Sequence, residues 1–168
     1  RPSSTRGPAG ANTSSASGDA ATARFFELDP FPEPNWLGHA LMTGMMAVST
    51  AQMAEKTVML LYVIGLPLSF RFALRRLNAP DLWAAVLIFP FIYGFTFRIG
   101  FLNFSLGLPL LLLALGTGPA LARSSGGRAV VPMMGLLTAL YFAHLTCFLL
   151  AVALLFTMSV QRAITERR

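Results

Sequence analysis

The chain has 168 residues, of which 55% are hydrophobic and only 12% are charged, and its formal net charge is +6. This composition, with a mean hydropathy of +0.62, indicates a membrane protein rather than a soluble domain. The arginines stand at the ends of apolar runs and do not gather with aromatic residues on one face, which argues against nucleic-acid binding. The single cysteine, Cys147, rules out a disulfide framework within the chain and is interpreted as buried packing. We expect no metal and no cofactor.

The first 24 residues are Ser, Ala, Gly, Thr and Arg with almost nothing apolar, and we expect them to be disordered. They are interpreted either as a linker, which we favour, or as an organelle transit segment. Because the chain begins at Arg1 rather than Met, we expect it to be processed or to be a piece of a longer protein.

Residues 25–54 are predicted to form an extracytoplasmic loop followed by an interfacial helix. Prolines forbid a helix through residues 30–34. From Asn35, the predicted N-cap, apolar residues follow at helical spacing. The helix has about fifteen residues, too few to cross a bilayer, so we expect it to lie along the membrane surface.

Four longer apolar runs follow, over about 57–74, 82–97, 101–122 and 129–160. Aromatic residues alternate between 89 and 97, but an open strand in lipid would leave its backbone unpaired, and a helix kinked at Pro90 is the better interpretation. The predicted fold is therefore all-α: a polytopic integral membrane helical bundle with about four transmembrane helices and one interfacial helix. Residues 55–160 form the transmembrane region, and 161–168 form a basic tail.

Arginine positions predict how the chain is oriented, because Arg and Lys favour the cytoplasmic side of short loops. If the arginines within 71–76 are cytoplasmic, two crossings return the chain to the same side at 123–128, and the acidic stretch 27–33 falls outside. The basic tail does not fit this orientation, since a fourth crossing would place its arginines outside the cytoplasm. Either a truncated product or a final helix that does not cross fully would remove this conflict.

Arg98 and Asn103 are polar residues in an aromatic, apolar run. A turn over 96–100 would place the guanidinium at the outer membrane surface. Asn103 would cap that turn or present its amide to the same pocket. One interpretation is a snorkelling Arg and a capping Asn; the other is that Arg98 binds an anionic headgroup or a lipid-linked phosphate, because its planar fork suits that ligand.

The last apolar run carries small residues at every fourth position, and these would share one helical face: Gly135, Ala139, Ala143, Cys147 and Ala151. Such a stripe lets another helix approach closely, and we favour helix packing over a lipid or cofactor groove. His144, one position from the stripe, is placed well inside the membrane. A neutral imidazole bonded to a neighbouring helix is the default, with a substrate or catalytic role as the alternative.

The segments "PNWLGHALM", "AEKTVMLLYVIGLPLSFRFALRRL", "FRIGFLNFSLGLPLLLLALG" and "LYFAHLTCFLLAVALLF" resemble successive segments of bacterial polytopic membrane proteins that are similar to the GT-C superfamily of glycosyltransferases. The resemblance covers roughly residues 25–160. It implies a bacterial inner-membrane protein that handles a polyprenyl-phosphate-linked sugar on the outer face. Superfamily members usually carry an essential Asp or Glu in an extracytoplasmic loop, and the weak catalytic candidates here are Asp29, Glu33 and His39.

Two functions remain open. In the first, the chain is a fragment of a GT-C-like glycosyltransferase or another lipid-linked-sugar-handling protein. Arg98, Asn103 and His144 would then bind the substrate or the lipid phosphate. This function predicts that Arg98 faces a water-filled cavity. In the second, it is a non-catalytic membrane subunit that packs against lipid and partner transmembrane helices. The second predicts that Arg98 meets headgroups or a partner acid, while the small-residue stripe contacts a helix of another chain.

Overall fold

A computed structural model of the chain describes residues 33–79, 82–123 and 129–165, and in these ranges the regular structure is all helical. This confirms the predicted all-α class. The expectations for residues 1–24 and for Asp29 lie outside the described residues. The elements in chain order are α2 (Leu37–Met46), α3 (Ala51–Arg76), the 3₁₀ helix η1 (Leu82–Ile88), α4 (Phe89–Ile92), α5 (Phe95–Arg98), α6 (Leu102–Arg123), α7 (Val130–Ala143) and α8 (Leu145–Thr165).

The first described helix, α2, folds back on the first half of α3 and also packs against α6 and α7. Asn35 does not cap it, contrary to prediction: the N-cap position is Trp36, without a side-chain bond. Asn35 instead has a positive φ of 73°, a left-handed conformation that Asn tolerates better than most residues. The next helix does have a side-chain cap, because the Thr50 hydroxyl accepts from the backbone N–H of Met53 at 3.4 Å. That α2 lies at the membrane surface stays a prediction.

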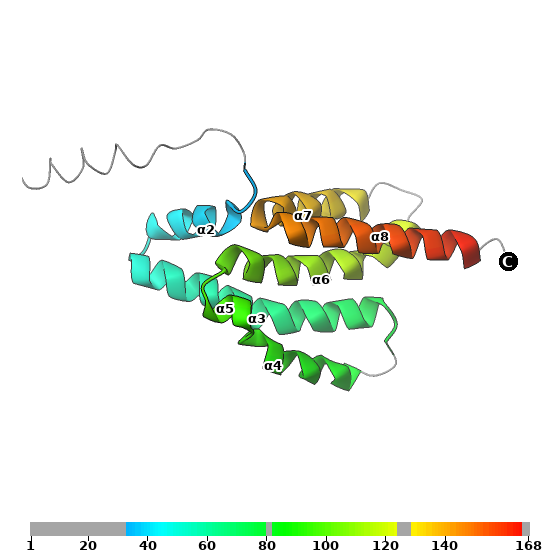
Figure 1. The fold of residues 1–168 in the computed structure, drawn as a ribbon, viewed down its shortest axis with the longest axis horizontal. Helices are drawn as coiled ribbons and strands as arrows, with labels where there is room; N and C mark the ends of the chain where they lie inside the picture. The colour runs from blue at the N-terminus through cyan, green and yellow to red at the C-terminus, as the bar shows by residue number, and fades with distance from the viewer. Residues whose placement is uncertain (1–32, 80–81, 124–128, 166–168) are drawn as a thin grey trace, which may run out of the picture. The chain divides into compact units, whose positions relative to one another are not determined.

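Helices α3 and α6 lie side by side through the middle of the bundle (Figure 1). Their close approach depends on Gly116, where an added Cβ would lie 2.7 Å from the Phe72 ring and 3.1 Å from the α3 backbone at Ala73. The apolar cluster between them is formed by buried Val58, Tyr62, Leu66, Ile92 and Leu106. A second cluster joins α6 to α7 and α8 around Leu111, Ala114 and Leu140.

The run at 82–97 is helical but is not one kinked helix. It divides into η1, α4 and α5, and Pro90 lies in the first turn of α4, where a missing N–H costs nothing. The interruption falls later, at Tyr93 and Gly94. The Tyr62 hydroxyl of α3 donates to the backbone oxygen of Ile92 at 3.0 Å, and its ring stacks on Phe97 at 4.8 Å between centroids. These contacts attach the interrupted segment to α3.

The run at 129–160 is also interrupted, and the prediction of one long crossing was wrong. His144 has extended backbone angles, φ −163° and ψ 125°, and ends α7 before α8 begins. The two helices then run side by side in opposite directions (Figure 1). The apolar periodicity continues through residue 144, so the reversal leaves no local signal in the sequence. Helix α8 reaches Thr165, five residues beyond the predicted end of the transmembrane region at 160.

Three helical segments are long and apolar enough to cross a membrane: Ala51–Arg76, Leu102–Leu121 and Leu145–Thr165. The chain is therefore an integral membrane protein. Two shorter apolar stretches, Trp83–Arg98 and Val130–Ala143, run back between them.

Successive passes run in alternating directions, so α3, α6 and α8 all end at the same end of the bundle (Figure 1). We call this the basic end, because it carries the arginines 71, 75, 76 and 162. The opposite end, which carries His39, Arg98 and His144, is called the histidine end. The reversal at His144 removes the conflict over the tail, because Arg162 now lies at the same end as Arg76.

Candidate functional site

Asn103 fastens α2 to α6 at the histidine end. Its Oδ1 accepts from the backbone N–H of Gly38 at 2.7 Å, and its Nδ2 donates to the backbone oxygen of Asn35 at 2.6 Å. Gly38 is buried, and a Cβ there would press on the Asn103 amide. Asn103 binds a donor and an acceptor group at the start of α2 and so holds that helix in position. These two bonds go to α2 and do not cap the turn at 96–100, the first of its two predicted roles.

A cavity of about 420 Å³ lies beside this contact. It is lined by residues from α2, from the turn before α6, from the first turn of α6 and from the α7–α8 junction: Asn35, Gly38, His39, Met42, Gly100, Phe101, Leu102, Asn103, Phe104 and His144. Gly100 takes a φ of +81°, which lets the chain turn sharply into α6. The sequence candidates His39, Asn103 and His144 therefore meet in one place.

His144 lies at the break between α7 and α8, at the histidine end of the bundle, and not within a continuous helix. Its Nδ1 accepts from the backbone N–H of Thr146 at 3.2 Å, so the ring acts as a cap for the start of α8. Its contact with a neighbouring helix is an edge-on packing against Phe104, with ring centroids 5.1 Å apart. With Nδ1 accepting, the neutral ring carries its proton on Nε2, which remains a donor. His39 is exposed beside it on α2.

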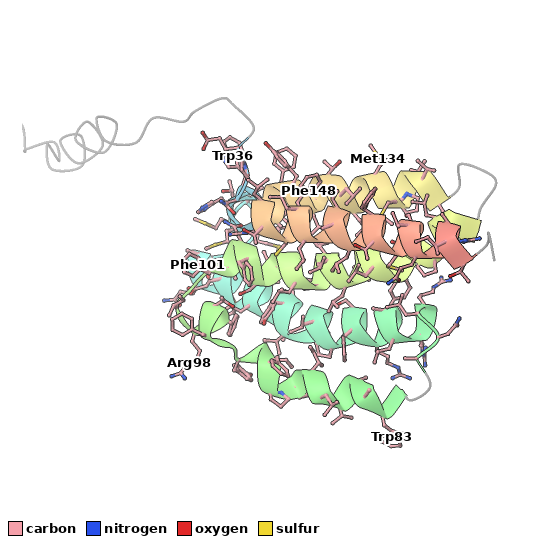
Figure 2. The ribbon with its side chains drawn as sticks, turned by 45° about the vertical axis from the view of Figure 1, so that its right-hand side comes forward. Trp36, Trp83, Arg98, Phe101, Met134 and Phe148 are labelled. Atoms are coloured by element: carbon pink, nitrogen blue, oxygen red, sulfur yellow. The ribbon has the colours of Figure 1, made fainter. Side chains whose placement is uncertain are left out.

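Arg98 lies at the same end but does not line this cavity. The residue ends α5, its side chain is exposed, and Figure 2 shows it directed away from the helices. The guanidinium is thus exposed at one end of the bundle, as the predicted turn implied, but separate from the pocket it was expected to share with Asn103. Glu33 is exposed and is likewise not among the cavity residues.

The small-residue stripe is divided by the break at His144, so it does not form one continuous face. Ala143, Cys147 and Ala151 are buried inside the bundle. An added Cβ at Gly107 of α6 would lie 2.8 Å from the Cys147 sulfur, so these small residues let α6 and α8 approach closely. Cys147 is thus buried against α6. Gly135, by contrast, is exposed, with open space around its Cα.

Sequence reasoning missed two components of the site, Gly38 and Phe104. Both act through contacts with residues tens of positions away, and neither stands out from its local sequence. Among the described residues, no group of three or more His, Cys, Asp or Glu side chains could hold a metal ion. Comparison of the chain with protein-family models, curated proteins and solved structures found no match.

Proposed function

We propose that this chain is a lipid-handling protein of a bacterial inner membrane, similar to the GT-C superfamily, whose cavity at the histidine end binds the polar head of a lipid-linked substrate. The observation that carries the proposal is the convergence of His39, Asn103 and His144, from three separate segments, on one cavity at an end of the bundle. The resemblance to GT-C proteins supplies the substrate class, a polyprenyl-phosphate-linked sugar.

Each of these side chains has a different role in the proposed binding. The imidazole N–H groups of His39 and His144 can donate to phosphate or sugar oxygens. Asn103, whose amide is engaged by the backbone of α2, positions His39. Arg98, exposed at the same end, raises the local concentration of an anionic headgroup without touching it.

The proposed activity is binding rather than catalysis by the described residues. Sugar transfer needs a general base, which in GT-C proteins is a carboxylate. The residues that line the cavity include no Asp or Glu within the described part of the chain. Asp29 lies outside that part, so a catalytic carboxylate has no assigned position here.

Binding of undecaprenyl phosphate to the full chain in detergent, followed by native mass spectrometry, tests the proposal. His39→Ala removes one donor, and His144→Asn removes the second imidazole while keeping an acceptor for the Thr146 N–H. Each is expected to weaken binding about tenfold, the effect of one lost hydrogen bond to a charged group. Thr157→Ala on exposed α8 is the control and should bind normally. Unchanged binding in both histidine variants would reject the proposed pocket.

A second candidate function, a non-catalytic subunit that packs against other helices, is favoured by the outer face of α7. Gly135, Thr138 and Ala139 line an open cavity of about 460 Å³ with Trp36 of α2. Small residues on a lipid-facing helix allow close helix contact. In a Cys147→Ala background, Gly135→Cys should form a disulfide-linked dimer in membranes if a second copy packs there. Absence of the dimer would count against self-association through this face.

A further inference from the structure

A groove separate from the histidine-end cavity runs between α3 and α6, with α2 and α7 along its rim, and has a volume of about 450 Å³. Its wall on α3 includes Leu61, Gly65 and Phe72, and its wall on α6 includes Leu106 and Leu113. The lining is apolar except for Ser69, whose hydroxyl donates to its own helix at Leu66 O, 2.9 Å away. A groove with no free polar group in its lining fits a hydrocarbon chain.

The length of the groove matches one leaflet of a bilayer. Leu61 and Phe72 both line it. They are eleven positions apart on α3, and a helix rises about 1.5 Å per position, which gives about 16 Å along its axis. The hydrocarbon core of a bilayer is about 30 Å thick, so the groove covers about half of it.

Positive charge lies at the end of this groove that faces the basic end. The Arg76 guanidinium stands 5.3 Å from the centroid of the Phe72 ring, and Phe72 is itself part of the groove lining. Arg71 lines an adjoining cavity that shares Leu68 with the groove. The described carboxylates are Glu33 and Glu55, before and at the start of α3, so the charge at this end of the described chain is cationic.

We infer that this groove binds one acyl chain of an anionic phospholipid, with the lipid phosphate on Arg76 and with Arg71 adding to the local positive charge. Charge complementarity favours this occupant: an apolar partner helix would fill the groove but offer no anion to Arg76, whereas an anionic phospholipid supplies both an acyl chain and a phosphate. The phosphate also suits Arg, whose planar fork donates to two oxygens at once. Arg76, which would hold the phosphate, is at the opposite end of the bundle from the histidine cavity, and the inference does not depend on the function proposed for that cavity.

The test is native mass spectrometry of the full chain, titrated in detergent with dioleoyl phosphatidylglycerol and with dioleoyl phosphatidylcholine. Phosphatidylglycerol is expected to be retained more strongly. Arg76→Gln should lower its affinity about fivefold, because one arginine near a membrane surface contributes about 1 kcal/mol to anionic lipid binding. The matched control is Arg162→Gln, which removes the same charge at the same end of the bundle but from α8, and should leave the affinity within about twofold.

A chain-length comparison tests the groove separately from the charge. Dihexanoyl phosphatidylglycerol has the same headgroup but cannot fill the groove, and should bind at least tenfold more weakly than the dioleoyl lipid. Gly65→Leu, which adds a side chain inside the groove, should remove most of this difference. Equal retention of the two dioleoyl lipids, equal effects of Arg76→Gln and Arg162→Gln, or equal binding of short and long chains would overturn the inference. Loss of undecaprenyl phosphate binding in His39→Ala, with phosphatidylglycerol retained, would show that the two sites are distinct.

Discussion

The two ends of this bundle are held together in different ways. At the histidine end the backbone leaves the helix at Asn35, Gly100 and His144, and polar side chains bond to backbone groups of other segments. Between the two ends, α3 and α6 run as continuous helices, and the contact between them on the basic-end side depends on close packing, as between Phe72 and Gly116. Chain reversals that lie at a membrane surface need polar partners for their freed backbone groups, whereas unbroken helices supply their own.

The difference also separates the two proposed sites. The histidine end gathers donors around a cavity suited to a hydrated headgroup, while the groove toward the basic end is apolar and ends at Arg76. Changes at each end should therefore have different consequences.

Gly116→Leu tests the packing of α3 against α6. Its side chain would collide with the Phe72 ring and with the α3 backbone, and overpacking of this kind costs about 3 kcal/mol or more. We expect loss of monodisperse protein in detergent, or a strongly lowered Tm. Gly135→Leu makes the same substitution where the surrounding space is open, and should leave the Tm nearly unchanged. Equal tolerance of both substitutions would show that α3 and α6 do not approach closely at Gly116.

Asn103→Ala tests the polar fastening at the histidine end. It removes both bonds to the start of α2 and leaves the buried Gly38 N–H without a partner, at a cost of about 2 kcal/mol. Hydrogen exchange should quicken in α2 while α8 keeps its protection. Asn103→Asp keeps the acceptor for Gly38 but loses the donor to Asn35, so it should have an intermediate effect. Uniform exchange in α2 across all three proteins would show that this contact does not hold the helix.

His144→Ala should have the smallest effect. It removes the acceptor for the Thr146 N–H at the start of α8, and loss of such a cap costs about 1 kcal/mol. The Tm should fall modestly, and His144→Asn should restore most of it because Asn is a good cap. A failure of Asn to rescue stability would assign the loss to the contact with Phe104 instead.

Composition and apolar run length were enough to predict the helical class and the extent of α6. A helix that crosses a membrane is specified by its own continuous run of apolar residues, which can be read directly from the sequence. The exposure of Arg98 was also predictable, because a turn was expected at 96–100, between two apolar runs. The interruption at His144 was not predictable, since apolar residues continue on both sides of it and only the packing of α7 and α8 around α6 requires the reversal. The pairing of Asn103 with Gly38 joins residues 65 positions apart, so no local pattern could reveal it.

The central claim is that the chain reverses at His144, which returns its C-terminal helix to the basic end. Single cysteines in a Cys147→Ala background test this directly: Leu77→Cys at the basic end, Val48→Cys at the histidine end and Thr165→Cys in α8, all at exposed positions. Each is treated with a membrane-impermeant maleimide in sealed vesicles of known orientation. The account predicts that positions 77 and 165 react from the same side and position 48 from the other. Reaction of position 165 from the side of position 48 would contradict it.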